Sequence, residues 1–209
     1  MQIDIRPYKE GDREAVVDVY RDGYEALRVG RGGDHEEHLV DRVQSLSNEA
    51  LACRILDGYF VVVAEESDSG ELLGIGAVSD LRLDLLLRSA RSKTHYVRRN
   101  LQGGKGGVGI GSRLRRASLG RARSMGHRKV WGYALSESRR WHAKFGATFH
   151  PFHNTYNPEH SGIVHYYEII LRPSGWNRLR IEPWLFRLSK LWPTLKARWR
   201  DRRRPPVAR

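Results

Sequence analysis

The strongest constraint on the fold is a glycine-rich segment near the middle of the chain, GGKGGVGIGSRL, residues 103–114. Six glycines within nine residues do not continue a strand or a helix, so the segment must form a loop whose backbone can approach another group closely. The arginine-rich residues that follow have helical spacing. Because backbone N–H groups at a helix N-terminus bind phosphate well, the segment predicts a phosphate-binding loop.

Two classes of phosphate loop fit this composition. Starting at Lys105, the segment resembles the lysine-first P-loop of partitioning-type ATPases, K-G-G-x-G-K-[ST]. That loop needs a lysine directly before a serine or threonine, to reach the β- and γ-phosphates and to bind magnesium. Ile110 and Gly111 occupy those places, and the preceding HYVRRNL is too charged for a buried parallel strand. The alternative, a pyrophosphate held by backbone N–H groups alone, is favoured.

The surrounding pattern predicts alternating strands and helices. YFVVVAEE and ELLGIGAVSD, joined by SDSG, predict an antiparallel hairpin. Residues 81–94 fit either a helical linker or a strand extension, and HYVRRNL, residues 95–101, predicts the strand before the loop. The expected order is β-α-α-β-β-β-α-β-α-β-β.

Helices are expected on both sides of the hairpin. The second, capped by Asp34, carries an apolar stripe that ends at Cys53. The helix after the loop is expected from Ser112 to Met125 and is rich in arginine. Its inner stripe is Leu114, Ala117, Ala122 and Met125.

With these elements in place, residues 1–172 resemble the GNAT superfamily of N-acyltransferases. The pattern [QR]-x-x-G-x-[GA] maps on residues 106–111, and ALSESRRWHAKFGATF resembles the family segment A-x-x-[FL]-Y-x-x-x-G-F. Glycine replaces the basic or amide residue at position 106, and His142 replaces the aromatic phenol before AKFG. The resemblance implies a three-layer α/β (α+β) fold, with helices flanking a mixed, mostly antiparallel sheet.

The resemblance also implies a site. Acetyl-CoA would lie between two splayed strands, HYVRRNL and KVWGYAL, as a co-substrate and without a metal. His142 is the expected proton donor, with Tyr133 and Tyr156 as substitutes, and His95 is a possible base beside a relayed water. The expected contacts to acetyl-CoA are Leu101, Lys105, Gly106, Gly107, Val108, Gly109, Ile110, Gly111 and Ser112.

Other polar clusters have weaker interpretations. Histidines 142, 150, 153, 160 and 165 lack a cysteine or acidic partner at ligand spacing, so no metal site is expected. DHEEHLVDR, residues 34–42, is an acidic patch that either attracts a cationic amine or forms a solvated helix start.

The excess of positive charge lies at the C-terminal end. Eleven of the 37 basic residues and two of the 24 acidic residues follow Arg172, so residues 1–172 carry a net charge of only +4. Residues 173–209 form a basic, tryptophan-rich segment with helical spacing, expected as an amphipathic extension. It could pack on the domain or on a second copy of the chain, or lie at an anionic membrane surface; nucleic acid is a less favoured partner.

The leading function is transfer of an acyl group, most simply acetyl, from coenzyme A to a small-molecule or peptide amine. A longer-chain acyltransferase at a membrane surface and a non-catalytic binding module are the alternatives. A single cysteine and the absence of an apolar leader lead us to expect a cytoplasmic protein, with possible peripheral contact at the inner membrane surface.

Overall fold

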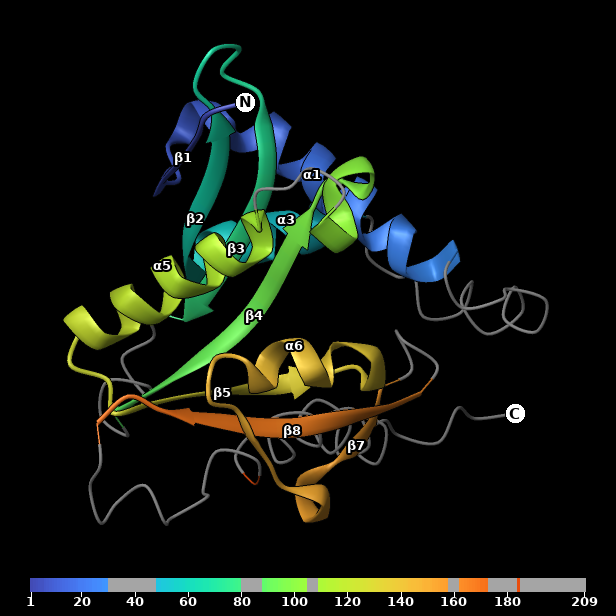
Figure 1. Ribbon diagram of the computed structural model, residues 1–209, viewed down its shortest axis with the longest axis vertical. Coiled ribbons are helices and arrows are strands. Elements are labelled where there is room, and N and C mark those ends of the chain that lie inside the picture. The colour runs from blue at the N-terminus through green and yellow to red at the C-terminus, as the bar shows by residue number, and fades with distance from the viewer. Residues whose placement is uncertain (30–47, 80–87, 105–108, 158–161, 173–183, 185–209) are drawn as a thin grey trace, which may run out of the picture. The chain divides into compact units, whose positions relative to one another are not determined.

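The computed structural model describes residues 1–29, 48–79, 88–104, 109–157 and 162–172, together with Trp184. The chain separates into two compact units, Met1–Pro173 and Ser174–Arg209. All elements below belong to the first unit (Figure 1).

An eight-stranded mixed sheet organises this unit. Its strands are β1 (Ile3–Pro7), β2 (Tyr59–Glu66), β3 (Leu72–Ser79), β4 (Ser89–Val97), β5 (Lys129–Ala134), β6 (Thr148–Phe149), β7 (Thr155–Asn157) and β8 (Gly162–Ile170). Their order in space is β1-β2-β3-β4-β5-β8-β6, with β7 paired to β8. Every pairing is antiparallel except β4 with β5. The expected fold class, α/β with a mostly antiparallel sheet, is therefore confirmed.

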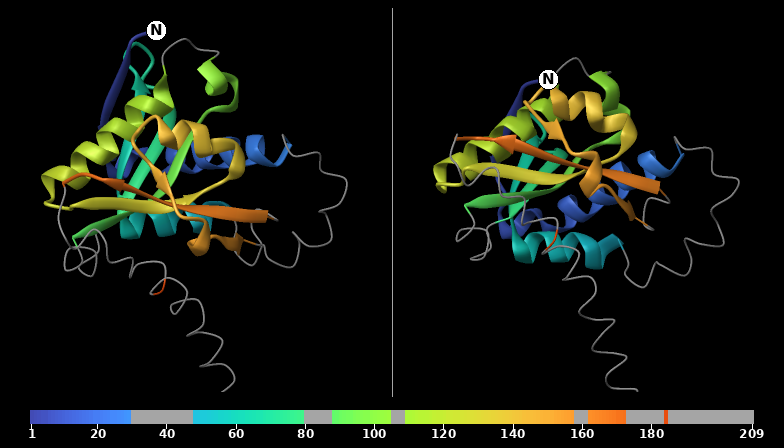
Figure 2. Two further views of the ribbon diagram at one scale, coloured as in Figure 1. Left: turned by 60° about the horizontal axis from the view of Figure 1, so that its bottom comes forward. Right: turned by 90° about the horizontal axis from the view of Figure 1, so that it is seen from below.

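Helices cover both faces of the sheet. The α-helices are α1 (Arg13–Val29), α3 (Asn48–Gly58), α5 (Ile110–Ser124) and α6 (Arg139–Ala143). Short 3-10 turns, η1 (Glu10–Asp12), η2 (Arg99–Gly104), η3 (Ser136–Ser138) and η4 (Pro151–His153), connect them. Figure 2 shows α5 and α6 on one side of the sheet and α1 and α3 on the other.

Residues alternate along β2 between the two cores, as the pleat of a strand requires. Val61 and Val63 pack with α1 and α3, whereas Val62 and Ala64 pack with Ile110 and Leu114 of α5. Both faces of β2 are thus buried, which explains why YFVVVAEE is a continuous apolar run rather than an alternating one.

Most predicted elements are confirmed. The YFVVVAEE strand coincides with β2, and its antiparallel partner is β3. The β-α-α-β-β-β-α-β-α order also holds, but the sequence interpretation missed the three-residue strand β7 between β6 and β8.

The strand before the glycine loop was placed wrongly. It runs from Ser89 to Val97, not from residue 95 to 101, so the open segment 81–94 contributes its last six residues to β4. The chain turns at Arg99, whose backbone N–H donates to Asp22 Oδ2 at 2.7 Å. A 3-10 turn, Arg99–Gly104, follows the strand after one residue, Arg98.

The helix after the loop begins earlier than predicted, at Ile110 instead of Ser112. Leu114 and Ala122 are buried as expected, and Ala117 and Met125 are half-buried. Arg115 of the same helix, which the apolar stripe does not include, is also fully buried.

Several predictions lie outside the described residues. They concern the Asp34 cap, the acidic patch 34–42, His160 and all of the basic extension except Trp184. No helix within the described part of the chain is long and apolar enough to span a membrane.

Candidate functional site

The site begins where strands β4 and β5 separate. Their parallel pairing covers only Ser89 with Lys129, Ala90 with Val130 and Arg91 with Trp131. Beyond this point β4 continues along β3, while β5 stays with β8, and Figure 1 shows the two strands diverging. Backbone groups on the β5 side of the last residues of β4 therefore lack a partner strand among the described elements.

A β-bulge in β4 accompanies this divergence. Gly76 pairs with His95 and Val78 with Ser92, so Lys93 and Thr94 together stand opposite one residue of β3. In a regular strand, two residues three positions apart face opposite sides of the sheet. The extra residue of a bulge between them brings both side chains to the same side. Ser92 and His95 consequently both face α5.

The N-terminus of α5 lies beside the far end of β4. Gly109 has φ +57°, a left-handed conformation that favours glycine, and its carbonyl accepts the first helical hydrogen bond, from Arg113 N at 3.0 Å. A Cβ added at Gly111 would lie 3.6 Å from Val97 Cγ2 and 3.8 Å from Trp141 Cζ2. The helix start is thus flanked by β4 and α6.

This helix start can receive an anion. The N–H groups of Ile110, Gly111 and Ser112 belong to the first turn, where an α-helix offers no carbonyl partner. The helix dipole adds about half a positive charge there. Ser112 is half-buried and Ile110 is buried. Of the other predicted donor contacts, Lys105, Gly106, Gly107 and Val108 lie outside the described residues, and Leu101 packs from η2 against an apolar cluster.

Arg115 of α5 fills the point of divergence. Its guanidinium donates from Nη1 to Ser92 Oγ at 2.5 Å and from Nη2 to Tyr167 Oη at 3.0 Å, and its Nε–H has no partner among the described residues. Within the described part of the chain, no carboxylate lies within ion-pair distance of it. A buried cation with only neutral partners is costly, so this arrangement suggests a function.

His95, the predicted base, lies under the same helix. Its Nε2 is buried and makes no hydrogen bond to a described residue, as is also true of Ser118 Oγ one turn after Arg115. Both atoms crowd Gly76, where an added Cβ would lie 3.1 Å from Ser118 Oγ and 3.2 Å from His95 Nε2. Burial, then the positive charge of Arg115 and the nearby His142, hold the pKa of His95 well below 6.5.

His142, the predicted acid, is a buried residue of α6 at 8% exposure. Its ring lies 4.4 Å from the Tyr167 ring and 4.8 Å from the Trp141 ring, measured between centroids. Burial, with a smaller contribution from Arg115, lowers its pKa to about 3. The imidazole is therefore uncharged at neutral pH and can offer only a neutral N–H group or a lone pair.

One of the two substitute phenols, that of Tyr133, does not share this location. Tyr133 lies on the other face of β5, where its ring packs against Trp131 and Tyr166. Tyr156 belongs to β7. The phenol that contacts His142 is that of Tyr167, which the sequence interpretation missed. Gly132, which pairs with Tyr167, was the available signal, because a glycine inside a strand often marks a close approach of another group.

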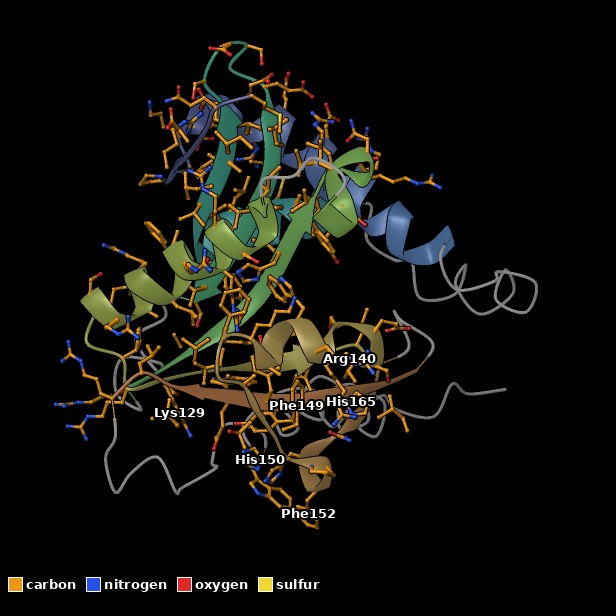
Figure 3. All side chains as sticks on the ribbon, in the orientation of Figure 1. Lys129, Arg140, Phe149, His150, Phe152 and His165 are labelled. Carbon is orange, nitrogen blue, oxygen red and sulfur yellow. The ribbon has the colours of Figure 1, made fainter. Side chains whose placement is uncertain are left out.

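Two of the remaining histidines, His150 and His165, contact other side chains of the protein. His150 Nε2 lies 3.1 Å from Glu168 Oε1, and His165 Nε2 lies 2.9 Å from Ser136 Oγ. Figure 3 shows His165 on β8 and His150 apart from it, on the segment between β6 and η4. No group of three histidine, cysteine or acidic side chains within the described ranges is arranged to hold a metal ion.

Comparison with known proteins clarifies this architecture. No protein-family model and no curated protein matches the sequence. Solved structures do match: the PaiA N-acetyltransferase from Thermoplasma acidophilum in complex with coenzyme A has a TM-score of 0.59 and 17% identity, covering 81% of this chain and 99% of its own. YncA, a putative acetyltransferase from Salmonella typhimurium with acetyl-CoA, has a TM-score of 0.59 and 20% identity, covering 84% and 97%.

A third matching structure is that of a GNAT superfamily protein. It is a GNAT superfamily phosphinothricin acetyltransferase from Sinorhizobium meliloti in complex with acetyl-CoA, with a TM-score of 0.59 and 18% identity over 84% of this chain and 91% of that one. The chain has the GNAT fold. The diverging strands and the α5 N-terminus are therefore parts of a fold that binds acetyl-CoA in these other proteins.

Proposed function

We propose that the protein is an N-acyltransferase that transfers an acetyl group from acetyl-CoA to a primary amine by direct attack. The observation that carries the proposal is the separation of β4 from β5 after Arg91, together with the glycine-led N-terminus of α5 beside the far end of β4 at Val97. This combination provides a phosphate site at one end and unpaired strand backbone leading away from it.

The donor would be held chiefly by backbone groups. The pyrophosphate would accept hydrogen bonds from Ile110, Gly111 and Ser112, with Lys105, Gly106, Gly107, Val108 and Gly109 as the preceding loop. The pantetheine arm would pair with β4 between Val97 and Ser92, a span of about 16 Å at the rise of a strand. The thioester would then reach the point where Ser92, Arg115 and Tyr167 meet.

The reaction requires two proton movements. The amine must lose a proton before or during its attack on the thioester carbonyl, and the departing sulfur must gain one. His95 and His142 are uncharged at neutral pH because of their lowered pKa values, so either can accept a proton from the amine. We propose His95 for this role because it lies on β4, beside the expected path of the donor.

The acceptor is proposed only as a class. A small-molecule or peptide amine fits the chemistry, and the acidic segment 34–42 would attract a cationic one. A longer acyl chain or a membrane-associated acceptor would follow if the basic segment 173–209 binds anionic lipid. Loss of that segment would then reduce binding to anionic vesicles, without an effect on acetyl-CoA affinity.

Position 111 provides the sharpest test. A side chain fits there, because the nearest atoms lie at ordinary contact distance. Gly111→Asp places a carboxylate where the pyrophosphate should bind. The helix itself should tolerate the change, because an acidic residue in the first turn interacts favourably with the helix dipole. We expect acetyl-CoA affinity to fall more than tenfold by calorimetry, with no loss of thermal stability. Gly111→Asn, equal in size and neutral, is the matched control and should bind at least fivefold more tightly than Gly111→Asp.

Turnover is tested with a panel of amines, acetyl-CoA and a thiol-release readout. Transfer to at least one amine is the expected result. If wild-type protein gives no calorimetric signal at millimolar acetyl-CoA, the proposal fails and a non-catalytic binding module is favoured.

A further inference from the structure

His142, the predicted acid on α6, is uncharged at neutral pH and can offer the departing sulfur only its neutral N–H group. A tyrosine phenol ordinarily has a pKa of about 10 and therefore carries its proton at neutral pH. The phenol of Tyr167 is the one that contacts His142, with ring centroids 4.4 Å apart. Tyr167 of β8 thus provides the phenol that α6 lacks.

The hydroxyl of Tyr167 lies at the point where β4 leaves β5. A Cβ added at Gly132 would lie 2.8 Å from Tyr167 Oη and 3.1 Å from the Ser92 carbonyl oxygen. Gly132 and Ser92 are the first residues beyond the last β4–β5 pair, Arg91 with Trp131. The phenol therefore crosses over the backbone of β5, and only a glycine leaves room for it.

The hydrogen bonding of Tyr167 leaves its own proton available. Arg115 Nη2 donates to Tyr167 Oη, so the phenol oxygen is an acceptor in that bond and its O–H can donate elsewhere. The guanidinium, which has no carboxylate partner among the described residues, would also stabilise the phenolate that remains after proton transfer. Stabilisation of the Tyr167 phenolate would explain why Arg115 is buried, which packing alone does not explain.

We propose that Tyr167 is the catalytic proton donor to the departing thiolate, and that Arg115 is the positioning residue that orients its phenol and stabilises its anion. The inference rests on the proposed acyl transfer. The amine lone pair forms the C–N bond, the C–S bond breaks with its electron pair on sulfur, and the Tyr167 proton passes to that sulfur. The amine proton goes to His95, and exchange with solvent returns a proton to the phenolate.

The test is the pH profile of acetyl transfer with one accepted amine, from pH 6.5 to 10.5, corrected for hydrolysis. Wild-type turnover should fall at alkaline pH as the phenol ionises. Tyr167→Phe should lower turnover at pH 7.5 at least tenfold, keep the acetyl-CoA dissociation constant within threefold and abolish the alkaline fall. Tyr166→Phe is the same change at the neighbouring residue, on the opposite face of β8. This variant should keep the alkaline fall in turnover.

Arg115 provides a second readout should Tyr167→Phe not fold. Arg115→Met should lower turnover at pH 7.5 at least tenfold with little change in the acetyl-CoA dissociation constant, and the conservative Arg115→Lys should retain more of the turnover. An alkaline fall that persists in Tyr167→Phe, or that disappears in His142→Phe instead, overturns the inference while the transferase proposal stands. Failure of wild-type protein to acetylate any amine of the panel refutes both.

Discussion

Gly132 is the position at which the architecture of the site can be tested through stability alone. An alanine there would place its Cβ 2.8 Å from Tyr167 Oη and 3.0 Å from Cζ, well inside van der Waals contact. The Tyr167 ring is 1% exposed and held by Arg115, so it has no free direction in which to move. The Ser92 carbonyl, 3.1 Å away, belongs to the backbone of β4.

Three contributions determine the expected change. Overpacking a dense interior costs about 1–3 kcal/mol. Weakening the bond from a charged guanidinium to the phenol costs up to about 1.5–3 kcal/mol. Replacing glycine by alanine restricts the unfolded chain and returns about 0.4–1 kcal/mol. Gly132→Ala should therefore lower the free energy of unfolding by about 2 kcal/mol.

The assay is urea unfolding with linear extrapolation, which measures a shift of the midpoint at constant slope. Gly120→Ala is the matched control, because Gly120 is exposed on α5 with no atom near its missing Cβ. The free energy of unfolding of Gly120→Ala should rise by about 1 kcal/mol, because alanine has the higher helix propensity. Equal stability changes in the two variants would refute the reasoning.

Two further predictions use the same unfolding assay. Gly23→Ala should destabilise by at least about 1 kcal/mol despite its place in α1, because the new Cβ would lie 2.7 Å from Tyr96 Cβ, an atom fixed to the backbone; a gain like that of Gly120→Ala would contradict the packing of α1 on β4. Because His142 has a pKa of about 3 when folded and about 6.5 when unfolded, the unfolded chain binds more protons between these values, and wild-type stability falls as pH decreases. His142→Phe should remove a slope of up to about 1.4 kcal/mol per pH unit below pH 6, so parallel stability curves for the two proteins between pH 7 and 5 would rule out a buried, uncharged His142.

The predictability of the fold from sequence depended on how local each signal was. The β2–β3 hairpin is encoded by two apolar runs around a turn and was predicted correctly. The start of β4 was missed because its residues, SARSKTHYV, pair with β3 through a bulge that no local pattern reveals. The burial of Arg115 was not predicted, because an arginine on an amphipathic helix ordinarily faces water.

The site was harder to predict than the fold. The glycine loop and α5 N-terminus follow from composition, because phosphate binding uses backbone groups. Tyr167 could not be separated from Tyr166 in HYYE, since adjacent strand residues face opposite sides and the sequence does not say which side carries the site. Gly76 and Gly132, each inside a strand, were the overlooked signs of close approach.

The central claim is that backbone N–H groups at the start of α5 grip the paired phosphates of a coenzyme A thioester. Amide chemical shifts of wild-type protein, followed during titration with acetyl-CoA, test it most directly. The account predicts that Ile110, Gly111 and Ser112 shift downfield and saturate together with residues of β4 from Ser92 to Val97. Saturable binding that leaves these amides unchanged would contradict it.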